Sequence, residues 1–157
     1  MERITTIRLN LQTAHESGAG SDGDVYLGLA GREFYLDTDK DDFEAGTSIN
    51  YVLGEGANIH NAGQNDPRGQ QLFLEHALEL PCYIRFKGKD RGDQWKLQRA
   101  SVAINEHVVP IWDTAALFSF GERGGIWMGT RATELVIMPI EDPGGVLGGA
   151  KGTSQSG

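Results

Sequence analysis

Short runs in which apolar and polar residues alternate, separated by glycine-rich turns, constrain this chain more than any other feature of its sequence. Ile7, Leu9 and Leu11 alternate with polar residues, and Val25–Leu29 repeats the pattern before a turn at Ala30–Gly31. A period of two residues is typical of a strand with one buried face, and two such runs around a short turn predict a β-hairpin. Further apolar runs of this kind cover residues 34–36, 49–53, 84–86, 95–104 and 135–140.

Many short strands joined by turns favour an all-β fold, an antiparallel sandwich or barrel, over a βαβ array. Patterns with a helical period are scarce, although a short helix fits residues 72–78 or 112–117. The chain has 157 residues, the size of one domain that buries a core without disulfide or metal staples.

The charge balance excludes broad classes of function. Lys and Arg number 14 and Asp and Glu number 22, so the formal net charge is −8. Such a surface repels phosphate backbones and bare anionic lipid, so we expect no nucleic-acid partner. The single cysteine, Cys82, excludes an internal disulfide framework and a cysteine-based metal cluster within one chain. We see no signal peptide and no membrane-spanning run, and we expect a soluble domain.

Acidic residues form the most concentrated chemical signal. Two groups stand out: Asp37, Asp39, Asp41, Asp42 and Glu44, balanced only by Lys40, and Glu16, Asp22 and Asp24 around a glycine-rich stretch. Calcium prefers several carboxylate and carbonyl oxygens on flexible loops. The spacing is not that of an EF-hand. A calcium site and a solvated acidic loop that keeps the protein in solution are both compatible with these residues.

The order of these segments resembles the start of a PLAT domain, the β-sandwich module of lipoxygenases, pancreatic-type lipases, polycystins and some bacterial toxins. A first strand is followed by Gly18–Leu27, by a second strand, and then by Asp41–Gly46. The likeness covers Thr5–Asp113, interrupted by a polar loop at 58–80. Its later parts are Ile84–Phe86, Asp90–Leu97, with a tryptophan opening a late strand, and Val102–Ile104.

This resemblance implies a sandwich of about eight antiparallel strands with calcium bound in loops at one end. That end would meet a membrane or a protein partner. Carried onto this sequence, the implied metal ligands are a carbonyl of Gly18 or Gly20 and the carboxylates of Asp22, Asp41, Asp42 and Glu44. Asp90 and Asp93 lie in a third loop as further contributors. Asp41 stands where many calcium-binding members have Asn.

The extent of the resemblance and the composition of the remaining residues together predict a division of the chain. We expect a PLAT-like sandwich over residues 1–113 with the loop insertion 58–80, an extension over 114–141 that packs on the sandwich or on a partner, and a Gly/Ser-rich tail over 142–157. Oligomers would form through the extension.

Aromatic residues separate this chain from the membrane-docking members of the family, which present them on the loops beside the metal. The loop at 15–23 carries no large apolar residue, and we expect Phe43 in the core. Four aromatics outside the matched loops either form an exposed patch or complete the core: Trp112, Phe118, Phe120 and Trp127.

The sequence contains no complete catalytic motif. Ser21 lies within a near match to a nucleophile elbow, but that elbow needs a strand-to-helix turn and Ser21 precedes a strand. The four histidines show no zinc-binding spacing. We therefore expect a non-catalytic binding module whose partner is a protein or a calcium-bridged lipid surface. The alternatives are a structural subunit of a larger assembly and, third, a hydrolase or toxin.

Overall fold

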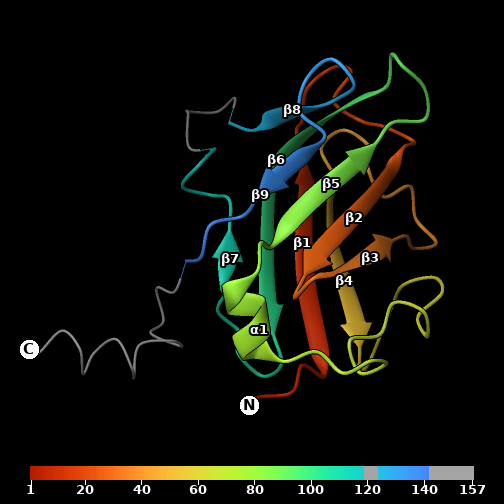
Figure 1. The fold of residues 1–157 in the computed structure, drawn as a ribbon. Helices are drawn as coiled ribbons and strands as arrows, with labels where there is room; N and C mark the ends of the chain where they lie inside the picture. Colours follow the sequence, from red (N-terminus) through yellow and green to blue (C-terminus); the bar gives the residue numbers. More distant parts are fainter. Residues whose placement is uncertain (119–123, 142–157) are drawn as a thin grey trace, which may run out of the picture.

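Two antiparallel sheets pack face to face in the computed structural model, which describes residues 1–118 and 124–141 (Figure 1). One sheet has the order β4 (Ser48–Gly54), β1 (Thr6–Thr13), β6 (Gln94–Ile104) and β7 (Trp112–Asp113), with β8 (Ile126–Gly129) also paired to β6. The other has the order β3 (Arg32–Leu36), β2 (Asp24–Leu29), β5 (Tyr83–Lys87) and β9 (Leu135–Ile137). The expectation of an all-β antiparallel sandwich is confirmed.

The core lies between the sheets and follows the alternation in the sequence. In β1, Ile7, Leu9 and Leu11 are buried, because every second side chain of a strand points to the same face. Trp95 at the start of β6 is fully buried, and its indole N–H donates to the hydroxyl of Thr13 at 2.8 Å. A buried tryptophan needs such a partner for its polar edge.

The segment 114–141 supplies strands to both sheets. Trp95 in β6 pairs with Met128 in β8, and Ile84 in β5 pairs with Val136 in β9. The domain boundaries proposed from the sequence stay predictions. Of the four aromatics left open, Trp112 is buried and Phe118 and Trp127 are half-buried. Phe120 and the predicted tail at 142–157 lie outside the described residues.

The insertion 58–80 contains the short helix α1 (Leu74–Glu79), close to one of the two expected positions. At the other position Trp112–Asp113 forms strand β7 instead of a helix. We call residues 58–72, which run beside β3 and β4, the side loop (Figure 1). No helix among the described residues is both long enough and apolar enough to cross a membrane.

Candidate functional site

Three loops meet at one end of the sandwich. They are the β1–β2 loop (14–23), the β3–β4 loop (37–47) and the β5–β6 loop (88–93), and together we call them the acidic end. The N–H of Ser21 donates to the carbonyl of Phe43 at 2.9 Å, which ties the first loop to the second. The hydroxyl of Ser21 donates to Asp93 at 2.8 Å, which ties it to the third.

Close approach of the first two loops depends on Gly20. A Cβ atom at this position would lie 2.9 Å from the amide nitrogen of Ala45 and 3.1 Å from Oε2 of Glu44, a crowding that side chains do not tolerate. Gly18 adopts φ +77°, in the left-handed region that favours glycine. Both glycines therefore shape the first loop, and neither lines the pocket described next.

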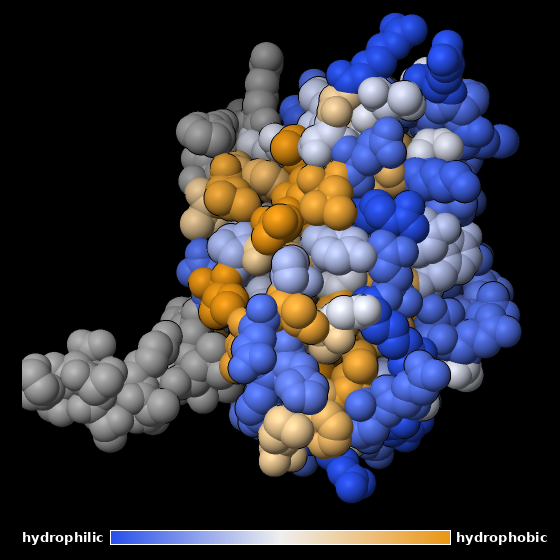
Figure 2. Space-filling view, in the orientation of Figure 1, coloured by the Kyte–Doolittle hydropathy of each residue, from blue (hydrophilic) through white to orange (hydrophobic). Residues whose placement is uncertain are grey.

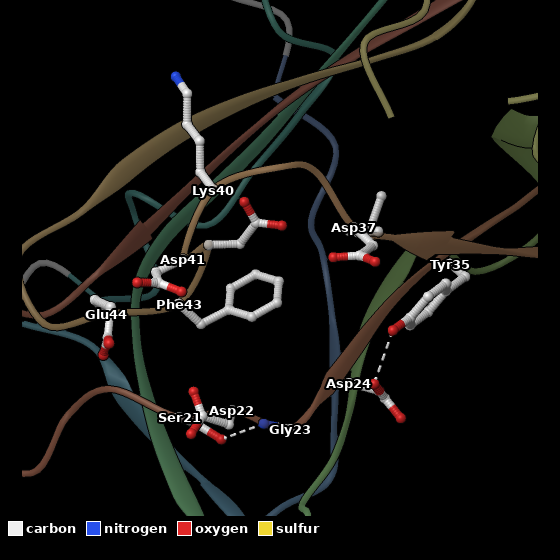
Figure 3. A pocket seen from close by; sticks show the side chains of 12 residues that line it. Ser21, Asp22, Gly23, Asp24, Tyr35, Asp37, Lys40, Asp41, Phe43 and Glu44 are labelled. Carbon is white, nitrogen blue, oxygen red and sulfur yellow. Dashed lines mark hydrogen bonds between the residues drawn. The ribbon is translucent and has the colours of Figure 1, made fainter. Parts of the chain in front are cut away.

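A pocket between the first two loops is lined by carboxylates. Figure 3 shows their side chains around the pocket, with the ring of Phe43 among them and the ammonium of Lys40 extending away. Six acidic residues line it: Asp22, Asp24, Asp37, Asp41, Asp42 and Glu44. The structure therefore brings together the four acidic residues that the resemblance singled out in the first two loops. Their role as metal ligands stays a prediction.

Asp42 differs from its neighbours because it is buried and fully engaged. Thr38 donates to it twice, through its N–H at 2.8 Å and through its hydroxyl. Burial raises the pKa of Asp42, since a carboxylate removed from water is less stable, although the hydrogen bonds from Thr38 oppose the shift. In this arrangement Asp42 stabilises the turn at 38–42.

Asp93 and Asp90 organise the third loop. Asp93 accepts hydrogen bonds from the hydroxyl of Ser21 and from the N–H of Lys89 at 2.7 Å. Asp90 accepts the N–H of Gly92 at 2.9 Å. The two aspartates line a second hollow that shares Asp22 with the first pocket.

Asp24 and Asp37 line the pocket but were not among the expected ligands. The hydroxyl of Tyr35 donates to Asp24 at 2.9 Å. Burial, followed by this hydrogen bond and the negative charge of Asp24, raises the pKa of Tyr35 to about 12. The predicted hairpin could have identified both residues. Val25 pairs with Leu36, so the residues just beyond this pair, Asp24 and Asp37, must lie at the same end of the hairpin.

The donor chemistry of the pocket suits a hard cation such as calcium, which takes six to eight oxygen ligands. In the described parts of the chain, however, no three His, Cys, Asp or Glu side chains are gathered closely enough to hold a metal as they stand. The carboxylates line the pocket without converging, so side chains must rotate for an ion to bind.

Comparisons with known proteins give a likeness of fold. No protein-family model matches the chain, and no curated protein sequence matches it. Among solved structures, the alpha toxin of Clostridium absonum superposes with a TM-score of 0.60 at 17% identity over 88% of this chain. The alpha-toxin from an avian strain of Clostridium perfringens gives 0.57 at 19% identity over 89%. Coral 8R-lipoxygenase, described as activated by calcium through a C2-like domain, gives 0.52 at 14% identity over 86%.

These structures support a PLAT/C2-like fold. The chain spans 32% of each toxin and 17% of the lipoxygenase, so it corresponds to one part of those larger proteins.

Proposed function

We propose that this chain is a non-catalytic binding module whose acidic end takes calcium and docks on an anionic lipid surface. The observation that carries the proposal is the pocket between the β1–β2 and β3–β4 loops, which six acidic residues line and from which the ammonium of Lys40 extends away. Crowded like charges are stabilised by a bound cation. The coral lipoxygenase supports the choice of ion, because its C2-like domain is described as the route of calcium activation.

Exposed carboxylates from both loops would hold the ion. Asp22, Asp41 and Glu44 are exposed, and among residues 1–118 and 124–141 no hydrogen bond or ion pair engages their carboxylates. They are free to turn toward a cation, with Asp24 and Asp37 on the pocket wall. Asp42 is not in this set, because both of its oxygens accept hydrogen bonds from Thr38.

Calcium would also decide the partner. With a formal net charge of −8, the chain is repelled by an anionic membrane in the absence of the ion. Bound calcium neutralises part of the acidic end and offers coordination positions to lipid phosphates. The proposal therefore requires that lipid binding depend on both calcium and anionic lipid.

Thermal unfolding in calcium and in chelator tests the metal site. An ion that binds only the folded state stabilises it by about 2.7 kcal/mol at a hundred times its dissociation constant. For a chain of this size we expect a rise in Tm of about 5–10 °C. The double variant Asp41→Asn/Glu44→Gln should lose the rise. Asp39→Asn should keep it, because Asp39 pairs with His60 and does not line the pocket. An unchanged Tm at millimolar calcium contradicts the proposal.

Co-sedimentation with vesicles tests the partner separately. We expect the chain to pellet with phosphatidylserine vesicles in calcium, and to stay in solution in chelator or with phosphatidylcholine alone. Asp41→Asn/Glu44→Gln should abolish the pelleting. Pelleting that is indifferent to calcium would rule out a calcium bridge even if the metal stabilises the fold.

A second candidate function is protein association through an apolar patch at β9. Leu135 and Ile137 expose 40% and 58% of their surface, and Ile140 and Leu80 are also exposed. Figure 2 shows an orange patch where β9 lies. Exposed apolar patches mark interfaces. Ile137→Lys should reduce the mass in solution if the chain associates here, whereas a chain that is already monomeric would exclude this candidate.

A further inference from the structure

The side loop lies against two strand edges that another chain could otherwise use. β4 is the outermost strand of one sheet and β3 is the outermost strand of the other. Two hydrogen bonds fix which residues of β4 bond to β1: the N–H of Thr13 donates to the carbonyl of Thr47, and the N–H of Glu55 donates to the carbonyl of Thr5. Because hydrogen-bonded positions alternate along an antiparallel pair, the odd-numbered residues of β4 bond to β1. The backbone groups of Asn50 and Val52 therefore point outward.

Asn58 bonds to these outward groups of β4 as a neighbouring strand would. Its side-chain oxygen accepts the N–H of Val52 at 2.8 Å, and its side-chain amide donates to the carbonyl of Asn50 at 2.8 Å. Its own N–H donates to the carbonyl of Val52 at 3.1 Å. One residue thus satisfies three edge groups.

Asn65 and His60 bond in the same way to the outer edge of β3. The side-chain oxygen of Asn65 accepts the N–H of Tyr35 at 2.8 Å. The N–H of His60 donates to the carbonyl of Asp37, just beyond the strand, at 2.9 Å. Asn65 is 7% exposed and its amide donates to the carbonyl of Asn61, so its side chain is held from both sides.

A cation from the strand itself fixes the loop in place. Arg32, the first residue of β3, donates to three backbone carbonyls of the side loop: Gln64 at 3.0 Å, Asp66 at 2.9 Å and Gly69 at 2.6 Å. Hydrogen bonds from a charged donor are stronger than neutral ones. The loop is therefore anchored to the strand whose edge it covers.

We propose that the side loop is an edge guard, which keeps β3 and β4 from pairing with a second copy of this chain. An open edge strand offers a row of unpaired N–H and C=O groups that template the addition of another strand. Every copy carries the same two edges, so uncovering them creates matching donors and acceptors on each molecule. The proposal is independent of calcium and of the apolar patch at β9.

The double variant Asn58→Ala/Asn65→Ala tests the guard by two measurements. Amide hydrogen exchange should accelerate by about tenfold at Val52 and Tyr35, whose N–H groups lose their acceptors. The mass in solution, measured by light scattering over a wide range of concentration, should rise with concentration above that of the unmodified chain. Both measurements are repeated in an Ile137→Lys background, which removes the apolar patch as a source of association.

Asn10→Ala is the matched control, because Asn10 bonds to the side chains of Ser48 and Asn50 on the sheet face and covers no edge. It should leave the mass unchanged. If the double variant fails to fold, Asn58→Ala alone uncovers only β4 at an exposed position. Faster exchange with no gain in mass would overturn the proposal, as would unchanged exchange, or association that Ile137→Lys abolishes.

Discussion

The acidic end and the side loop are both polar loop regions at the margins of the sandwich, yet within the described chain only the acidic end leaves some of its carboxylates without a hydrogen bond or ion pair. In the side loop, Asn58 and Asn65 bond to backbone groups of the strands, and Arg32 of β3 bonds to backbone carbonyls of the loop. At the acidic end, Asp41 and Glu44 remain exposed, and their carboxylates receive no hydrogen bond or ion pair from the described chain. Satisfied polar groups fix a loop in one conformation, whereas free carboxylates keep their charge for a ligand.

Removing the side chain of Phe43 should produce the largest loss of stability, because this side chain joins the acidic end to the core. Phe43 is buried, and its ring packs edge-to-face on Trp95 at 5.4 Å and against Tyr51 at 6.4 Å. Phe43→Ala should lower the free energy of unfolding by about 3–5 kcal/mol, measured by denaturant titration.

The same substitution at Phe73, the half-buried residue that directly follows the side loop and precedes α1, should cost less and serves as the comparison. Equal losses at the two positions would show that Phe43 does not support the acidic end through the core.

The adjacent residues Asp41 and Asp42 should separate charge from structure. Asp42→Ala removes the acceptor for two hydrogen bonds from Thr38 and should cost about 1–3 kcal/mol of stability. Asp41→Ala changes an exposed side chain and should stay within about 0.5 kcal/mol without calcium. In calcium the order should reverse: Asp41→Ala should lose more of the metal-induced rise in Tm than Asp42→Ala. Equal costs without calcium would mean that Asp42 is not a structural residue.

Much of the fold could be predicted from the sequence, because apolar and polar residues alternate in strands that have one buried face. Ile7, Leu9 and Leu11 show it, and so do the hairpin strands on either side of Ala30–Gly31. Strands β7 and β8 were not predicted. Each is short, and each is held by pairing with β6, so its own residues carry little periodicity.

The candidate site was accessible only in part. The resemblance to PLAT domains indicated Asp22, Asp41, Asp42 and Glu44, all of which line the pocket. Sequence cannot separate Asp41 from Asp42, because the difference arises from burial and from the two hydrogen bonds of Thr38. The side loop was predicted only as a polar insertion, since the bonds of its asparagines join residues whose partners depend on the tertiary fold.

The smallest expected effect is on the pH dependence of stability, to which Asp42 at the acidic end and Asp66 in the side loop contribute with opposite signs. Burial raises the pKa of Asp42 above its ordinary value, whereas the guanidinium of Arg68, hydrogen-bonded to Asp66, lowers the pKa of Asp66 in the side loop. Asp42 therefore adds stability below its unfolded-state pKa, and this is lost as pH rises through the folded-state pKa. Asp66 adds stability above its unfolded-state pKa, and this is lost as pH falls through its folded-state pKa.

Carboxyl carbon chemical shifts, followed by NMR in chelator, measure both groups in one titration. We expect the Asp42 midpoint on the high-pH side of that of an unstructured aspartate, and the Asp66 midpoint on the low-pH side. Arg68→Gln should move the Asp66 midpoint upward and leave Asp42 unchanged, because the lost hydrogen bonds belong to Asp66 alone. Midpoints shifted in the same direction would erase the electrostatic distinction between the side loop and the acidic end. Calcium should then shift only Asp42 and its neighbours in the pocket, since a bound cation stabilises nearby carboxylates in their charged form.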